Sequence, residues 1–347
     1  MKKIVDGFCT SGGKHCITTA LKQVFDYHGC TMSEEMIFGL GAGSSFCYIN
    51  LHTSPMVSGR TKPFVFEDTL AKRLNIQIKC KKSKEYNVAF QKSIQLLNEN
   101  KPVLIYVDMP YLGYLNLNKN SHFGGHAVVL IGYDDENEKF YISDRDNSDY
   151  PIRTPKGNIS KDYHCIDYSE LEQARSSSYR PFPAQNKYLD IKIEQPVLIT
   201  ETMIFSAVQE ACQGMLNAPA QLLGLNGIRK FSKEVIKWNV FDDSRLKTAA
   251  ITNYFQISAD GGTGGGIFRK MYGDFLIEAS LITNIQDLKD IGIQYHDVSL
   301  KWDGIASMFW ELSETLNREL LKDISSIIND IYNEEKSLLL RLNDVVQ

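Results

Sequence analysis

The sequence lacks the segments that carry a protein to or across a membrane. Residues 1–13, "MKKIVDGFCTSGG", hold no apolar core of signal-peptide length, and no apolar run approaches the roughly 18 residues of a membrane span. An excess of positive charge is missing as well. The formal net charge of −4 gives no general attraction to nucleic acid. We therefore expect a cytoplasmic protein whose partners include neither a membrane nor a nucleic acid.

Cysteines are scattered without a CxxC pair, so we expect no zinc site or other metal site. Their number is odd, which fits reduced thiols better than a disulfide framework. The seven are Cys9, Cys16, Cys30, Cys47, Cys80, Cys165 and Cys212. The one basic run, "KCKKSK" at 79–84, is typical of a solvated surface, although it would also suit an acidic protein partner.

Length and composition allow two hydrophobic cores, because the chain has 347 residues of which 43% are hydrophobic. Serines and two prolines interrupt any periodicity at 174–187, "ARSSSYRPFPAQNK". We predict a first domain over residues 1–175 and a second over 188–347.

The first domain is predicted to be α+β. Apolar residues recur every three or four residues over 16–28, which indicates a helix that ends at Gly29. A short helix should begin at Ser33, with a loop at 39–46. A further, polar helix is expected over 86–98. Strands are expected over 102–109, 127–133 and 139–143, the last two as a hairpin around "DDENE".

The second domain is predicted to be mostly helical. Apolar residues at helical spacing mark one helix at 204–215 and another at 316–331. The second stripe would line either the core or the interface of a homodimer.

Cys16 follows the loop "SGG" and opens the first helix. A cysteine at a helix N-terminus lies beside unpaired N–H groups and the positive end of the helix dipole, which lower its pKa and favour the thiolate. The bland alternative is a small buried residue, a common role of free cysteine. The two glycines favour the nucleophile, because they let backbone approach a substrate closely.

A nucleophilic thiol needs a base and a group that orients the base. His126 opens the strand "HAVVLIGY" after two glycines, and Asp144 ends the returning strand of the same hairpin. The two ends should meet, so Asp144 would fix the tautomer of His126. The alternatives are a core histidine and a turn aspartate, with Asp146 and Asp149 as rivals for the acidic role. A second "HC", at 164–165, lies in a polar stretch without glycines.

These motifs carry a resemblance. The run "HCITTAL" at 15–21, "FGLGAGSSF" at 38–46 and "GHAVVLIGY" at 125–133 are similar to the papain-like domain of the butirosin-biosynthesis acyltransferase family, and "GGTGGGIFRKMYGDFLIEA" at 261–279 resembles its second domain. The resemblance implies a papain-like N-terminal domain and a mostly helical C-terminal domain. The sequence is also similar to papain-like peptidases that process bacteriocin leaders, and to an amide synthase of closthioamide assembly.

The resemblance implies an acyltransferase of antibiotic assembly with Cys16, His126 and Asp144 as catalytic residues. Such an enzyme takes an acyl group from the phosphopantetheine thioester of an acyl or peptidyl carrier protein, through an acyl-enzyme, and delivers it to a small amine, either a diamine or an aminoglycoside-like molecule. It binds no cofactor of its own. The alternatives are a papain-like cysteine peptidase or thioesterase, and an inactive module that binds carrier proteins.

One residue departs from the leader-peptidase pattern. Those peptidases place an oxyanion-hole glutamine six residues before the cysteine, where this sequence has Thr10. The second oxyanion donor is therefore Thr10, Ser11, Lys14 or a backbone N–H of the "SGG" loop.

The string "GGTGGG" at 261–266 precedes Arg269. N–H groups at a helix start bind anions, so Gly264, Gly265, Gly266 and Arg269 are candidates for holding a phosphate, naturally that of phosphopantetheine. The string does not match GxxxxGK[ST]. The competing interpretation is that the glycines allow close backbone packing.

Overall fold

The computed structural model describes residues 1–51 and 54–346. The chain divides into two compact units that interleave along the sequence. Unit 1 contains residues 1–34 and 75–197, and unit 2 contains residues 35–74 and 198–347. The domain bounds expected from the sequence, 1–175 and 188–347, stay a prediction. The compact units differ from that division because residues 35–74 pack with the second half of the chain.

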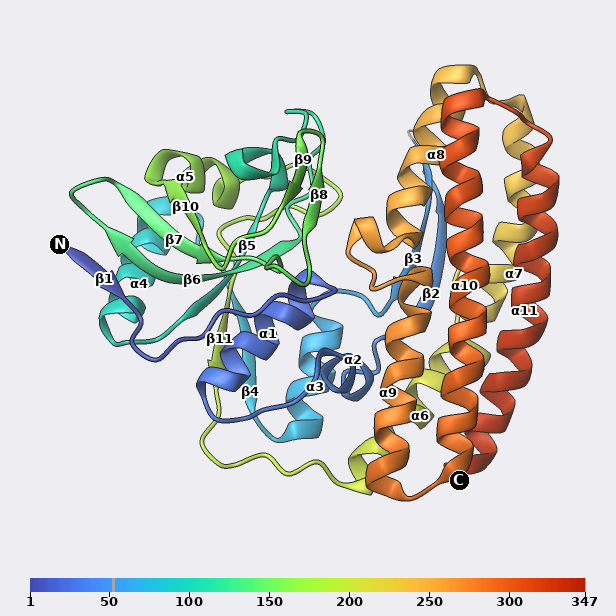
Figure 1. Ribbon diagram of the computed structural model, residues 1–347, viewed down its shortest axis with the longest axis horizontal. Coiled ribbons are helices and arrows are strands. Elements are labelled where there is room, and N and C mark those ends of the chain that lie inside the picture. Colours follow the sequence, from blue (N-terminus) through green and yellow to red (C-terminus); the bar gives the residue numbers. More distant parts are fainter. Residues whose placement is uncertain (52–53, 347) are drawn as a thin grey trace. The chain divides into compact units, whose positions relative to one another are not determined.

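Unit 1 is built on a seven-stranded antiparallel sheet in the order β10-β7-β6-β5-β11-β4, with β1 added beside β6 (Figure 1). Its strands are β1 (Lys2–Ile4), β4 (Gln77–Lys81), β5 (Val103–Val107), β6 (His126–Asp134), β7 (Lys139–Ser143), β10 (His164–Asp167) and β11 (Tyr188–Lys192), with β8 (Ile152–Thr154) and β9 (Gly157–Ile159) as a separate pair. Its helices are α1 (Cys16–Tyr27), α4 (Tyr86–Asn98) and α5 (Tyr168–Ser176), with short turns η1 (Met109–Tyr111) and η2 (Gly113–Leu115).

The two faces of this sheet carry different helices. Val128 and Ile142 point into a core that also contains Leu97 of α4 and Leu171 of α5. Ser143 follows Ile142 and so points to the opposite face, because side chains alternate along a strand. There its hydroxyl donates to Gln23 Oε1 of α1 at 2.6 Å. The helix that begins at the candidate nucleophile is thus fixed to the strand that ends beside Asp144.

Unit 2 combines a helical bundle with one β-hairpin. The hairpin consists of β2 (Ser44–Asn50) and β3 (Pro55–Arg60). The helices and short turns are α2 (Glu34–Leu40), α3 (Val65–Leu74), α6 (Glu201–Leu216), α7 (Gly224–Val235), η3 (Ile236–Val240), α8 (Asp243–Ile257), η4 (Ala259–Gly261), η5 (Gly266–Phe268), α9 (Arg269–Thr283), α10 (Gln286–Thr315) and α11 (Leu320–Val345). The predicted class, α+β with a mostly helical second part, is confirmed.

Two expectations about unit 2 were wrong in detail. The predicted loop at 39–46 contains the start of β2. The predicted helix at 316–331 is interrupted, because Leu316 has a left-handed backbone with φ of 55° and ends α10. Ile324, Ile328 and Ile331 are fully buried inside unit 2, so this stripe serves the core.

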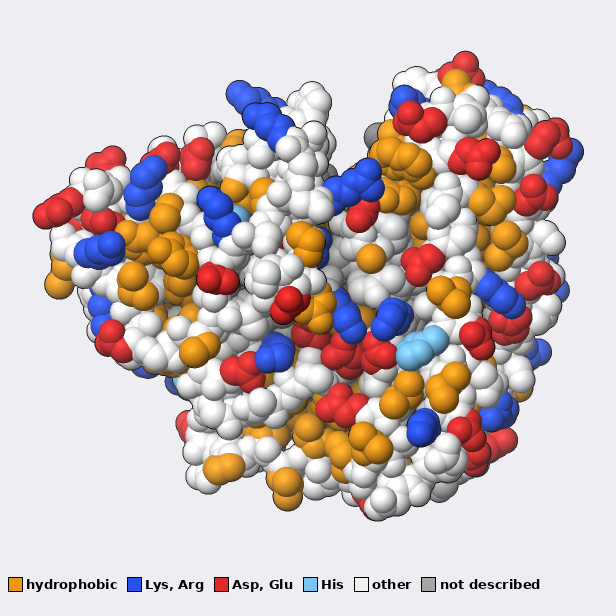
Figure 2. All heavy atoms as spheres, viewed as in Figure 1, with side chains coloured by type: hydrophobic (Ala, Val, Ile, Leu, Met, Phe, Trp, Pro, Cys, Tyr) orange, Lys and Arg blue, Asp and Glu red, His pale blue; other side chains and the backbone are white. Residues whose placement is uncertain are grey.

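Charges on the surface are mixed. Figure 2 shows acidic and basic side chains interspersed on the visible face of each unit. Among the described helices, none combines the length and the apolar character that crossing a bilayer requires.

Candidate active site

Cys16 is the first residue of α1 and is partly exposed. The residue before it, His15, has extended backbone angles and no side-chain cap. The loop that leads to Cys16 is held by backbone bonds. The Gly13 N–H donates to the Arg145 carbonyl at 2.8 Å. The nucleophile candidate therefore lies at a helix start whose approach is fixed to the chain just after Asp144.

Glu34 holds the same loop from the other side. Its carboxylate is buried and accepts the N–H groups of Lys14 at 2.7 Å and His15 at 3.3 Å. The hydroxyls of Thr18 and Thr19 donate to it at 2.8 and 2.7 Å. Sequence reasoning missed this role, since a carboxylate before an apolar run is typical of the first turn of its own helix.

His126 and Asp144 meet where the hairpin prediction placed them. His126 begins β6, Asp144 follows β7, and His126 Nε2 lies 2.9 Å from Asp144 Oδ2. Both side chains are buried. His126 also hydrogen-bonds the Cys16 side chain. Because Nε2 is engaged by the carboxylate, Nδ1 is the nitrogen that remains for the sulfur.

The charges of the three groups reinforce one another. Burial by itself lowers the pKa of His126, but the Asp144 carboxylate and the Cys16 sulfur outweigh burial and raise that pKa above its usual value. Burial raises the pKa of Asp144, and the interaction with His126 more than reverses this, so the carboxyl stays ionised. The site therefore favours an imidazolium beside a sulfur, which is the protonation state of a cysteine nucleophile.

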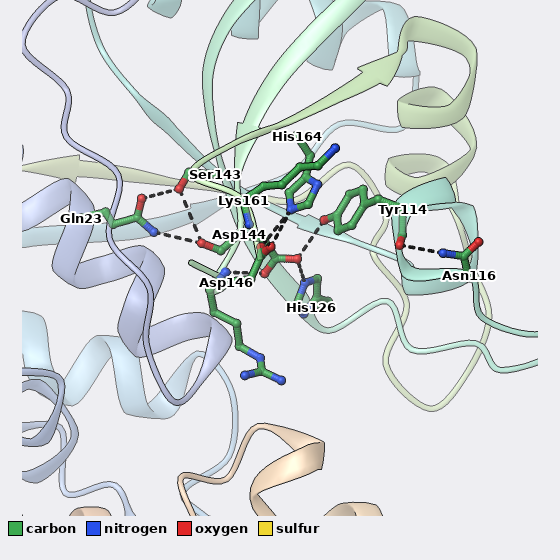
Figure 3. Close-up of polar contacts among 10 residues, drawn as sticks. Gln23, Tyr114, Asn116, His126, Ser143, Asp144, Asp146, Lys161 and His164 are labelled. Carbon is green, nitrogen blue, oxygen red and sulfur yellow. Dashed lines mark hydrogen bonds and ion pairs between the residues drawn. The ribbon is translucent and has the colours of Figure 1, made fainter. Parts of the chain in front are cut away.

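Asp144 has two further partners. The Tyr114 hydroxyl donates to Oδ2 at 2.8 Å, and the Arg145 N–H donates to Oδ1 at 2.7 Å (Figure 3). Tyr114 lies on η2, where no sequence pattern singles it out.

The rival residues form a separate pair. Asp146 bonds His164 Nε2 at 2.8 Å through Oδ1 and accepts the Lys161 N–H at 2.9 Å (Figure 3). Asp149 is exposed in a turn, where its N–H donates to Asn147. Of the three aspartates, Asp144 is the one that contacts His126.

The candidate oxyanion donors differ in availability. The Ser11 hydroxyl is buried and has no hydrogen-bond partner among the described residues. The Lys14 N–H is taken by Glu34. Thr10 lines a cavity of about 490 Å³ with Phe8, Cys9 and other residues. Their role stays a prediction, and the Ser11 hydroxyl is a buried donor without a partner among the described residues.

Three of the four candidate phosphate-binding residues, Gly265, Gly266 and Arg269, donate their hydrogen bonds within unit 2. Arg269 is fully buried and forms a two-bond ion pair with Glu335 at 2.9 and 3.0 Å. Its remaining nitrogen donates to three backbone carbonyls of unit 2. The Gly266 N–H donates to Asp303 at 2.8 Å, and the Gly265 N–H to Thr263 at 3.2 Å. These contacts favour the packing interpretation for this segment.

A metal centre finds no support in the part of the chain that the structure describes. Within residues 1–51 and 54–346 no three His, Cys, Asp or Glu side chains lie together as metal ligands would.

Two family models match the sequence. The model described as "Butirosin biosynthesis protein H, N-terminal" matches residues 15–145, and "Domain of unknown function (DUF4872)" matches residues 169–342. The second match spans half of the chain, so the chain belongs to the family with that domain of unknown function, and its residues 15–145 are similar to the N-terminal part of butirosin biosynthesis protein H. The resemblance inferred from the motifs is thereby confirmed, and residues 15–145 of the family match contain Cys16, His126 and Asp144.

Three chains of solved structures match this one. One of them comes from a crystal structure of a protein from Bacillus anthracis described as a C39-like peptidase, with 16% identity and a TM-score of 0.36. The alignment covers 56% of this chain and 99% of the other. No curated protein matches the sequence. The match of residues 15–145 to the butirosin biosynthesis protein H model, together with a cysteine, histidine and aspartate in contact, supports a cysteine-dependent enzyme.

Proposed function

We propose that this protein, like the butirosin-biosynthesis acyltransferases that its N-terminal part resembles, transfers an acyl group from a carrier-protein thioester to an amine in antibiotic assembly. The observation that carries the proposal is the contact of His126 with both Cys16 and Asp144. A module that only bound carrier proteins would have no use for a histidine whose pKa is raised beside a thiol.

The proposed reaction has two halves. The Cys16 thiolate attacks the thioester carbonyl and forms a new thioester, while the carbon–sulfur bond to phosphopantetheine breaks and the departing thiolate takes the proton of His126. An amine then attacks the acyl-Cys16 carbonyl. His126 accepts the amine proton, the carbon–sulfur bond to Cys16 breaks, and the product is an amide. Atoms and charge balance in each half without a cofactor.

The oxyanion of each tetrahedral intermediate needs two donors. The backbone N–H groups at the start of α1 would supply one. The unpartnered Ser11 hydroxyl is the best candidate for the other, while Thr10 and Lys14 remain the alternatives.

The second candidate function is hydrolysis, as in a cysteine peptidase or thioesterase, because the same residues would serve water as the acceptor. The two functions differ in the product. One acyl-carrier substrate should yield mostly amide when a diamine or aminoglycoside is present in excess. Free acid as the main product in every case would favour a thioesterase or peptidase.

Trapping tests the covalent step directly. The protein is incubated with a carrier loaded with an acyl thioester and then digested with trypsin. We expect the acyl mass on residues 15–22, "HCITTALK", which contain Cys16 and no other cysteine. Residues 162–175 contain Cys165, an exposed thiol that serves as the internal control. Absence of an adduct on Cys16 in both wild type and His126→Ala would favour the binding module.

A further inference from the structure

The contacts that hold Asp144 extend beyond the three candidate catalytic residues. Asp144 Oδ2 accepts both the Tyr114 hydroxyl at 2.8 Å and His126 Nε2 at 2.9 Å. The carboxylate oxygen that orients the histidine is therefore itself oriented by a tyrosine (Figure 3).

Tyr114 is in turn fixed by a second histidine and aspartate. The Tyr114 ring stacks on the His164 ring, with centroids 3.8 Å apart and planes inclined by 12°. His164 Nε2 bonds both carboxylate oxygens of Asp146, at 2.8 and 3.0 Å. The Lys161 N–H holds Asp146 Oδ2 at 2.9 Å. His164 and Asp146 are both buried, so the stacking platform has little freedom to move.

We propose that Tyr114 is a positioning residue of the candidate active site, held by the His164–Asp146 pair so that its hydroxyl fixes Asp144 against His126. The "HC" at 164–165 thus contributes its histidine to the site rather than its cysteine. The proposal rests on the proposed function only for the identity of the reaction, since its geometry concerns the ionisation of Cys16 and His126 in the free protein.

The groups that face Asp144 set the direction of the expected effect. His126, Tyr114 and the Arg145 N–H all lower its pKa, against the effect of burial. Removing the Tyr114 hydroxyl takes away one of these, so the Asp144 pKa rises toward its usual value. As the pH falls, Asp144 is then protonated earlier, and the imidazolium and the thiolate lose their support earlier.

The test measures the reactivity of Cys16 without any acyl donor. Iodoacetamide alkylates the thiolate with loss of iodide, and the adduct on residues 15–22 is quantified by mass spectrometry at each pH. We expect the acid limb of this profile in Tyr114→Phe to lie about half a pH unit above that of wild type. On that limb the rate should be about threefold lower.

Tyr27→Phe is the matched control. It also removes a partly buried hydroxyl contact in unit 1, since the Tyr27 hydroxyl donates to the Asn100 carbonyl at 2.5 Å, but none of its bonds reaches Asp144. Its acid limb should coincide with that of wild type. A Tyr114→Phe limb that coincides with wild type, or limbs of both variants that shift together, would overturn the proposal.

His164→Gln keeps the test decisive if Tyr114→Phe does not fold. Glutamine retains a donor for Asp146 but removes the ring on which Tyr114 stacks. The acid limb should shift in the same direction by a smaller amount, and an unshifted limb would count against the proposal.

Acyl transfer separates this proposal from the proposed function. In Tyr114→Phe, kcat for amide formation should fall about tenfold with KM for the carrier unchanged. If wild type forms no amide while the alkylation limb still shifts, the acyltransferase assignment falls and the positioning role stands. If wild type forms amide and the limb does not shift, the positioning role falls alone.

Discussion

Residues 11–15 and 261–266 are both glycine-rich loops that lead toward a helix, α1 in unit 1 and α9 in unit 2. The first ends at Cys16, a partly exposed thiol that contacts His126. The second leads to Arg269, a fully buried guanidinium whose donors are occupied by Glu335 and by backbone carbonyls. Glycine in both loops permits close approach. The loops differ in the group at the helix start. The first presents a partly exposed thiol, whereas the donors of the guanidinium at the second are occupied within unit 2.

Cys16→Ser should have the largest effect on the reactive loop. A serine hydroxyl is scarcely ionised at neutral pH, so amide formation from the carrier substrate should fall by about 10⁴-fold or more. The measurement is kcat/KM, with circular dichroism to show that the fold is kept. Cys165→Ser is the control and should match wild type. Retained activity in Cys16→Ser would remove the basis of the comparison between the two loops.

Asp144→Asn should have the next largest effect. The amide keeps the size of the carboxylate but cannot support the imidazolium, so kcat should fall about 10²- to 10⁴-fold, which is less than for Cys16→Ser. Asp146→Asn keeps an acceptor for His164 and should lose only a few-fold. If Asp146→Asn proved the more damaging of the two, Asp146 and not Asp144 would be the group that supports the base.

Arg269→Met tests the other loop. It leaves the buried Glu335 carboxylate without its cationic partner, which should lower the free energy of unfolding by about 3–5 kcal/mol. Denaturant unfolding measures this loss, and the alkylation rate of Cys16 in the folded protein should stay unchanged. A normal stability combined with a raised KM for the carrier would instead favour a phosphate site at the glycine string.

The sequence was most informative where periodicity is local. The helix expected at 86–98 is α4 (Tyr86–Asn98), and the hairpin strand expected at 139–143 is β7 (Lys139–Ser143). The break at Leu316 was missed because the apolar stripe runs through it, while a left-handed residue leaves no mark on the pattern. The β2 strand was missed because glycines precede it.

The residues of the candidate site also divide into those that local patterns predict and those that they do not. The meeting of His126 and Asp144 follows from the pairing of two consecutive strands, and a helix start is readable at Cys16. Glu34 and Tyr114 could not be found, because their contacts join segments 20 and 30 residues apart through loops. A loop tyrosine and a helix-start glutamate each have a common local role that hides the distant one.

Gly13→Ala should have the smallest effect, and it bears most directly on the two loops. A Cβ at Gly13 would lie 2.3 Å from both Glu34 Oε2 and Thr19 Oγ1, so the buried carboxylate that holds the start of α1 must move. We expect a loss of about 1–3 kcal/mol in stability and a roughly tenfold slower alkylation of Cys16, because the thiol shifts from its place beside His126.

Gly266→Ala is the matched variant in the second loop. Its Cβ would lie 2.4 Å from the Ser299 backbone, and its φ of +53° disfavours alanine. It should lose similar stability with no change in the alkylation rate of Cys16. Equal slowing in both variants would mean that the alkylation rate of Cys16 reports stability alone. The hydrogen bonds of Glu34 would then have no specific role in positioning the thiol.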